Sequence, residues 1–167
     1  GSIRELSEVI GDSLDARSWS QAAKHYCGAG AEHGIDFTVI GKRRRNLKKQ
    51  GRHREVGILD MVSQGSFWPT ERRRAAGYTD SEVCDFCSAK DTSAQHLFWE
   101  CPKIKSLMAD KWKVSASLVA VAKKGAANCP VLWCRGLVPN DRTYGELLGQ
   151  LRPGATLSRG LFAEHEV

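Results

Sequence analysis

The chain has 167 residues, which is enough for one domain with a buried core or for a small domain with extensions. Hydrophobic residues make up 41% of it, within the globular range, and no apolar run is long enough to cross a bilayer, so no membrane partner is expected. The formal net charge of +6 and the isoelectric point of about 9.1 favour an acidic partner, and nucleic acid is the commonest one.

Residues 1–41 are predicted to form an N-terminal helical segment. Apolar residues recur at helical spacing from Ile3 to Ile10, and Gly11 is expected to interrupt this helix before a second one begins. Residues 35–40 alternate and are rich in β-branched side chains, which indicates either a short strand or an extended linker.

Residues 42–54 form a basic strip that contains eight lysine or arginine residues and no acidic residue. Such a block repels itself unless a counter-charge lies nearby. It can be a strip that binds phosphates, a solvated and partly disordered loop, or a nuclear localisation signal. We favour nucleic-acid contact, with the candidate residues Lys42, Arg43, Arg44, Arg45, Lys48, Lys49, Arg52 and Arg54.

A second group of arginines follows a predicted amphipathic helix over residues 54–64. Thr70 is expected to cap a short helix that contains Arg72, Arg73 and Arg74 and ends at Gly77. Three adjacent arginines cannot share one helix face, so at least one is expected to point towards nucleic acid and another to lie against the core.

Trp68 lies beside Pro69, just before this short helix. We expect a core position for its side chain, and stacking on a nucleic-acid base is the alternative.

The most specific pattern in the chain is Cys-x2-Cys-x8-His-x4-Cys, formed by Cys84, Cys87, His96 and Cys101. Two sulfurs on a tight turn converge on one metal, and the histidine and last cysteine complete a tetrahedron from a second element. A set of three thiolates and one imidazole suits Zn²⁺ better than Mg²⁺ or Ca²⁺. The sequence therefore predicts one zinc ion in a knuckle.

The residues around the last two ligands predict a short helix. Thr92 to Gln95 reads as a capping box with Thr92 as N-cap, which would start the helix that contains His96. Pro102 disfavours helical geometry at Cys101, so the helix is expected to end or kink at the last ligand.

Free thiols or disulfides are the alternatives to a metal site. A disulfide framework needs an oxidising compartment, and the chain shows no signal peptide, so its six cysteines favour an intracellular location, nuclear or cytoplasmic. Four protein ligands leave no position for water, so the zinc is expected to be structural and the segment non-catalytic.

Around the predicted metal ligands, residues 55–105 contain a characteristic series: Ile58-Leu59, Trp68-Pro69-Thr70, Arg72-Arg73, Ala76-Gly77-Tyr78, Cys84, Cys87, His96 and Cys101-Pro102. With this series the segment resembles the zinc-knuckle region of non-LTR retrotransposon reverse transcriptases. In that family a Trp-Thr-x-x-Arg-like helical segment precedes the cysteine pair, whereas here Pro69 separates the Trp from the Thr. The resemblance implies a segment that follows a polymerase domain and handles template RNA or target DNA.

The chain is predicted to be mainly helical from residue 103 to 124, either continuously or with a break near Val114-Ser115, and to stop at Gly125. Residues 129–134 read as a short buried or extended segment, whose two cysteines lack two further ligands for a second metal. Thr143 is expected to cap a last helix. Gly1-Ser2 is interpreted as a remnant of tag cleavage, which would make the chain a fragment of a longer parent.

The predicted fold is mainly α, with short helices packed around a Cys3His zinc knuckle and little or no β-structure. Its parts are the N-terminal segment (1–41), the basic strip (42–54), the knuckle core (55–125) and a C-terminal extension (126–167). The predicted function is zinc-dependent, non-catalytic binding of RNA, DNA or both. The alternative is a structural connector that packs against other domains of a larger parent polypeptide.

Overall fold

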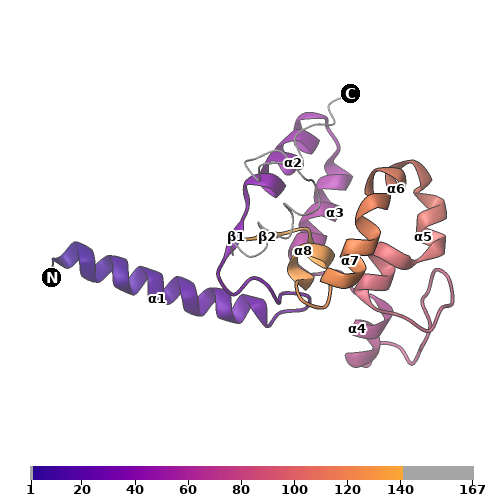
Figure 1. Ribbon diagram of the computed structural model, residues 1–167, viewed down its shortest axis with the longest axis horizontal. Coiled ribbons are helices and arrows are strands. Elements are labelled where there is room, and N and C mark those ends of the chain that lie inside the picture. Colours follow the sequence, from indigo (N-terminus) through magenta and orange to yellow (C-terminus); the bar gives the residue numbers. More distant parts are fainter. Residues whose placement is uncertain (1, 141–167) are drawn as a thin grey trace.

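The computed structural model describes residues 2–140 and is mainly α-helical, as predicted (Figure 1). The only β-structure in the described part is one antiparallel pair of two-residue strands. In chain order the elements are α1 (Ile3–Ala23), β1 (Ile35–Asp36), α2 (Thr38–Lys49), α3 (His53–Ser63), α4 (Thr70–Ala75), the π-helix η1 (His96–Glu100), α5 (Pro102–Leu107), α6 (Ala109–Ser115), the 3-10 helix η2 (Ala116–Leu118), α7 (Val119–Gly125), α8 (Pro130–Arg135) and β2 (Val138–Pro139). None of the described helices is both long and apolar enough to cross a membrane.

Helix α1 is one continuous helix that projects from the body of the molecule, so the predicted break at Gly11 is wrong (Figure 1). A glycine inside a helix costs only about 1 kcal/mol relative to alanine. A capping box at the start of α1 offsets part of this cost: the Ser2 hydroxyl accepts from the Glu5 amide, and the Glu5 carboxylate accepts from the Ser2 amide. No residue of α1 is buried, and only its C-terminal end, with Trp19 and Ala23, packs against the core, so the projecting part depends on local interactions.

The predicted strand over residues 35–40 is real only in its first two residues. Ile35 lies opposite Pro139 and Asp36 lies opposite Val138, so the pairing partner is a hundred residues away in sequence. The Asp36 carboxylate then accepts from the Thr38 amide at 2.8 Å, which turns the chain into α2. Hydrogen bonds from Thr38 also lower the pKa of Asp36.

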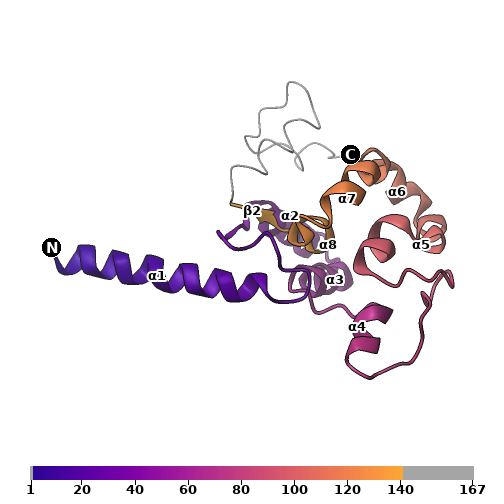
Figure 2. The same ribbon diagram turned by 60° about the horizontal axis from the view of Figure 1, so that its bottom comes forward.

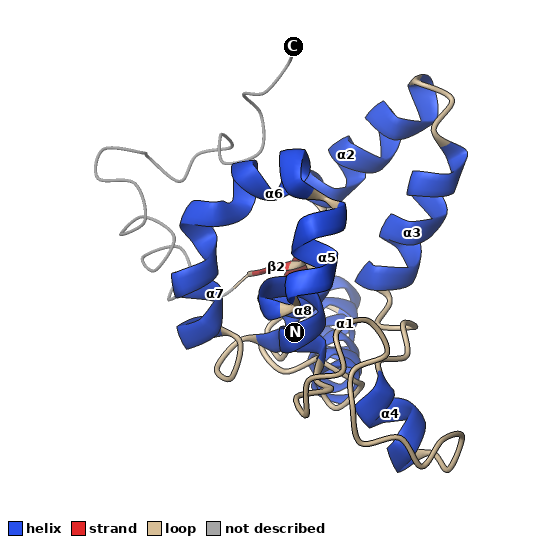
Figure 3. Ribbon diagram, turned by 90° about the vertical axis from the view of Figure 1, so that its right-hand side faces the viewer, coloured by secondary structure: helices blue, strands red, loops and turns tan. Residues whose placement is uncertain are grey.

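The basic strip is helical, because residues 42–49 lie in α2 and residues 53–54 begin α3. Figure 3 shows the two helices as neighbours, and we call residues 38–63 the basic hairpin. Leu47 and Val56 are the buried residues of the two helices. The strip therefore has a defined inner and outer face, which a disordered loop would lack.

The main core lies between the segment before α2 and the pair α7–α8. Ala31 and Ile35 pack with Ala122, Val131 and other buried residues in one apolar cluster. Residues 126–140 thus contribute to the core, whereas residues 141–167 of the predicted C-terminal extension, including the helix expected at Thr143, lie outside the described residues. The segment 129–134, expected to be buried or extended, is helical over Pro130–Arg135, and Val131, Trp133 and Cys134 of this helix are buried.

Gly125 makes room for a buried indole at this core. A Cβ at this position would overlap Nε1 of Trp133 and lie 3.0 Å from its Cε2. Trp133 is 6% exposed, and its ring packs edge-on against Trp99 at 5.8 Å between centroids, so it has little freedom to move aside.

Gly125→Ala is therefore expected to lower the free energy of unfolding by about 1–3 kcal/mol through overpacking, as measured by urea denaturation. The matched control is Gly57→Ala in α3, where a Cβ would meet nothing within 4 Å. There the better helix propensity of alanine is expected to add about 0.5–1 kcal/mol of stability. Equal and small effects at the two positions would contradict the packing described here.

Candidate metal centre

The first two predicted ligands lie on a tight turn that is held by main-chain hydrogen bonds. The Cys84 amide donates to the Ala89 carbonyl at 2.8 Å, and the Ser88 amide donates to the Cys84 carbonyl at 2.9 Å. Burial raises the pKa of the Cys84 thiol, but hydrogen bonds from the amides of Phe86 and Cys87 outweigh it, so the net shift is downward. At Cys87 a main-chain hydrogen bond at Ala89 lowers the pKa, but burial and the neighbouring thiols of Cys101 and Cys84 outweigh it and raise the pKa. The turn therefore favours a thiolate, the form that binds metal, at Cys84.

The other two ligands lie at the two ends of η1. His96 begins this π-helix, and the Cys101 amide donates back to the His96 carbonyl at 2.8 Å. Cys101 itself is extended, with φ −61° and ψ 113°, as predicted from Pro102. The π-turn places the histidine and the last cysteine on the same side of the chain.

The predicted cap at Thr92 is wrong by one residue. The His96 amide donates to the Ser93 hydroxyl at 3.0 Å, and the Ser93 amide donates to the Asp91 carboxylate at 2.9 Å. Gln95 reaches forward to Glu100 instead of back to the cap. Aspartate often accepts a hydrogen bond from the amide two residues later and so forms a turn. Asp91 does this with the Ser93 amide, and this aspartate is the sequence signal that points to Ser93 as the cap.

All four predicted ligands converge. One ligand atom from each of Cys84, Cys87, His96 and Cys101 lies within 4.8 Å of the others, and Cys87 Sγ lies 3.2 Å from His96 Nε2. Tetrahedral zinc with bonds of about 2.0–2.3 Å requires ligand atoms roughly 3.5–4 Å apart. Three of the four residues are buried, and Cys101 is fully so. The arrangement is compatible with one bound metal ion.

Two carboxylates lie beside the histidine. Asp91 and Glu100 each place an oxygen within 4.8 Å of a His96 nitrogen. Burial raises the pKa of Asp91, but hydrogen bonds from Ser93 outweigh it and lower the pKa below its usual value. Because His96 is shared with the cysteines, these acids do not form an independent site; they can orient the imidazole from outside the coordination sphere.

Two arginines of α4 form ion pairs with acidic residues of the predicted zinc-knuckle segment. Arg73 pairs with Asp85, between the two cysteines, and also donates to Thr70. Arg74 lies 3.4 Å from Glu82 in the loop that leads to the turn. Residues 73 and 74 are predicted nucleic-acid contacts, yet both charges have an acidic partner within the protein.

Arg72 faces inward, as expected for one of the three arginines. Its Nη1 donates to the carbonyls of Gly65 and Phe67, and its guanidinium lies over the rings of Tyr26 and Trp68 at 4.6 and 4.2 Å. Trp68 is 45% exposed, so the expected core position is wrong. Its ring contacts the Arg72 guanidinium and, edge-on at 5.6 Å between centroids, the ring of Tyr78.

Thr70 is the first residue of α4 and not its cap, since no side chain caps this helix. The end of the helix is predicted correctly. Gly77 has φ +76°, and the amides of Gly77 and Tyr78 donate to the carbonyls of Arg74 and Arg73.

The basic residues of the basic hairpin differ in whether they have an acidic partner. Arg44 makes a bidentate pair with Asp60 of α3 at 2.8–3.1 Å, which raises the pKa of Arg44 and lowers that of Asp60. Arg52 pairs with Glu55 at 3.0 Å. No acidic side chain of residues 2–140 forms an ion pair with the exposed cations Lys42, Arg43, Arg45, Lys48, Lys49 and Arg54.

Three of these cations form a row. Lys42, Arg45 and Lys49 recur at i, i+3 and i+7, on the face opposite the buried Leu47, and the row spans about 10 Å. Figures 1 and 3 both place α2 at the opposite end of the molecule from α4 and the knuckle loop. The two predicted basic groups therefore do not form one continuous surface.

The position of the cap can be tested with two neighbouring substitutions. Ser93→Ala removes the side-chain acceptor of the His96 amide and is expected to cost about 0.5–2 kcal/mol of unfolding free energy. Thr92→Ala is the control, because the Thr92 hydroxyl makes no hydrogen bond to the helix start. Urea denaturation of the metal-loaded protein measures both, and a larger loss at Thr92 than at Ser93 would favour the predicted capping box.

Searches of protein-family models, curated proteins and solved structures find no match to this chain.

Proposed function

We propose that this chain is a non-catalytic nucleic-acid-binding module, held together at one end by structural Zn²⁺ and binding phosphates mainly through the basic hairpin. The resemblance of residues 55–105 to the zinc knuckle of non-LTR retrotransposon reverse transcriptases agrees with this role. The six cysteines stay reduced in the intracellular compartment, nuclear or cytoplasmic, that the role requires.

The location of the charge is the observation that carries the proposal. The basic hairpin contains eight of the 25 basic residues and two of the 19 acidic residues of the chain. Its net charge of +6 equals that of the whole protein, because the other 17 basic and 17 acidic residues cancel. A net positive charge concentrated in one hairpin attracts a polyanion, and phosphate contacts need no base recognition.

The metal has a scaffold role in this proposal. The cluster offers four protein ligands, and a zinc ion with four protein ligands has no open position for water or substrate. Zinc would fix the turn at Cys84–Cys87 against η1, and Arg73 would tie that turn to α4 through Asp85. This keeps the region next to the exposed Trp68 ordered.

A binding titration tests the proposal. Labelled RNA, single-stranded DNA and duplex DNA are titrated with the zinc-loaded protein at several salt concentrations. Affinity is expected to fall with salt, with a slope of log affinity against log salt of about 0.7–0.9 per phosphate contact. Absence of binding to all three at low salt would overturn the proposal.

The exposed face of α1 favours a second candidate, the structural connector. Helix α1 projects from the body of the molecule (Figure 2). Ile3, Leu6, Ile10 and Leu14 recur at helical spacing along one of its faces and are 51–87% exposed. A row of this kind is typical of a helix that packs on another protein surface. Two results together would favour the connector. The nucleic-acid affinity would not depend on salt, and the protein would self-associate in a way that Leu6→Glu and Ile10→Glu abolish.

A further inference from the structure

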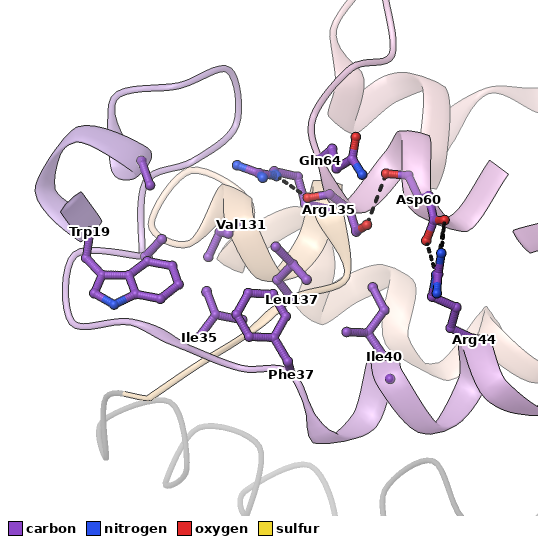
Figure 4. A pocket seen from close by; sticks show the side chains of 14 residues that line it. Trp19, Ile35, Phe37, Ile40, Arg44, Asp60, Gln64, Val131, Arg135 and Leu137 are labelled. Carbon is purple, nitrogen blue, oxygen red and sulfur yellow. Dashed lines mark hydrogen bonds and ion pairs between the residues drawn. The ribbon is translucent and has the colours of Figure 1, made fainter. Parts of the chain in front are cut away.

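The structure has a pocket beside the basic hairpin that no sequence motif indicates. It has a volume of about 370 Å³ and lies between the end of α1, the start of α2, α3 and α8 (Figure 4). We infer that this pocket receives one nucleotide of a single strand, with the base against Trp19 and Phe37 and a phosphate on Arg135. This inference rests on the nucleic-acid binding proposed above and adds the class of nucleic acid.

The walls of the pocket suit a planar apolar group. Figure 4 shows Trp19, Ile35 and Phe37 on one side and the Arg44–Asp60 pair on the other. The rings of Trp19 and Phe37 lie 6.2 Å apart with a tilt of 34°. Phe37 is 55% exposed although it is a large apolar residue, so a ring face is free to stack on a base.

Arg135 supplies a positive charge without an acidic partner among the described residues. Its Nε donates to the Ser63 carbonyl at 2.8 Å, which fixes the side chain along the pocket wall. Burial lowers the pKa of this guanidinium, and no carboxylate compensates for the desolvation. A cation held in this way among apolar walls gains most from an anionic group on the ligand.

The position of the pocket connects it to the phosphate-binding surface. Phe37 immediately precedes α2, and Arg44 of the same helix lines the pocket. The cation row begins at Lys42, five residues after Phe37, so a strand that leaves the row at the N-terminal end of α2 reaches the pocket at Phe37. Only an unpaired base can enter without the unstacking cost of a few kcal/mol that a duplex requires. The geometry thus favours single-stranded RNA or DNA over duplex.

The first test compares Phe37→Ala with Phe86→Ala. Phe86 is a matched control because it is 51% exposed and lies outside the pocket, on the knuckle turn. Loss of one stacking face at Phe37 is expected to weaken binding of labelled oligothymidylate about 5- to 100-fold and leave binding of a duplex of the same length unchanged. Equal losses for Phe37→Ala and Phe86→Ala, or no loss for Phe37→Ala, would overturn the assignment.

The second test uses tryptophan fluorescence and the charge of Arg135. Oligothymidylate is expected to quench the protein, and Trp19→Phe is expected to remove that part of the quenching. Thymidine 5′-monophosphate is the second probe. Quenching by both probes supports a site for a single nucleotide. Quenching by the oligonucleotide alone supports a nucleotide site that also needs the neighbouring phosphates of the strand. Quenching that Trp19→Phe leaves intact overturns it.

Arg135→Gln is expected to reduce the salt slope for the single strand by about 0.7. Thermal melting of each variant checks that the fold is kept. If Arg135→Gln fails to fold, Phe37→Ala still tests the pocket through its stacking wall. Single-strand binding that is unchanged in all three variants would refute the pocket while the proposed function stands. Absence of binding to any nucleic acid would refute both.

Discussion

Replacing Cys101 with serine is expected to abolish zinc binding and to unfold the knuckle. Cys101 is fully buried, and its sulfur converges with those of Cys84 and Cys87 and with His96. Structural zinc in small domains contributes on the order of 10 kcal/mol to folding near neutral pH, so its loss exceeds what the surrounding contacts can offset. Metal analysis should fall from about one equivalent per chain to near zero, and thermal melting should lose cooperativity.

The effect of Cys101→Ser is expected to extend beyond the ligands. Phe98 lies between His96 and Cys101, and its ring packs edge-on against Phe67 at 5.0 Å. The indole of Trp99 donates to the Trp133 carbonyl at 2.7 Å, so η1 also contacts the main core. Loss of the metal therefore releases aromatic contacts on both sides of η1, whereas α1, which buries no residue, should keep its helicity.

Cys129→Ser is the matched control. Cys129 is also fully buried but belongs to the main core and not to the metal cluster. This variant is expected to lose packing stability while it keeps its full zinc content. Equal zinc contents in Cys101→Ser and Cys129→Ser would show that the Cys3His cluster does not hold the metal.

Replacing Lys42, Arg45 and Lys49 together with glutamine is expected to flatten the salt dependence of nucleic-acid binding. Each phosphate contact contributes about 0.7–0.9 to the slope, so the triple variant should lose about 2–3 units. Binding should weaken alike for all sequences, since phosphates carry no base information. The substitutions lie on the face opposite Leu47, so the fold and the zinc content should not change.

The control for this variant removes the same charge elsewhere. Lys24, Lys103 and Lys124 are exposed and lie outside the basic hairpin, so their replacement by glutamine lowers the net charge equally without touching α2. A much smaller change in slope is expected for this control. If both triple variants flatten the slope to the same extent, binding responds to net charge and not to the row on α2.

The metal cluster could be predicted from the sequence because its geometry depends on residues that are close together in the chain. All four ligands lie within eighteen residues, and the cysteine pair, the turn between its members and the effect of Pro102 on Cys101 depend on neighbours in the chain. The cap was misplaced because Gln95 completes a capping-box pattern with Thr92, whereas Ser93 is followed three residues later by His96. The hydrogen bond from Ser93 to Asp91 decided between them.

The mainly helical fold and the pattern of basic and apolar residues were determined by the sequence, since helices depend on contacts within one or two turns. Tertiary structure alone decided which basic side chains are paired with acidic residues of the protein and which remain free to bind phosphate. Arg44 is paired with Asp60, sixteen residues away, and Arg73 with Asp85, and neither acid can be identified as a partner from spacing. The strand pair and the pocket at Arg135 join residues about a hundred positions apart, and such contacts are fixed by the packing of the whole core, which a local pattern does not encode.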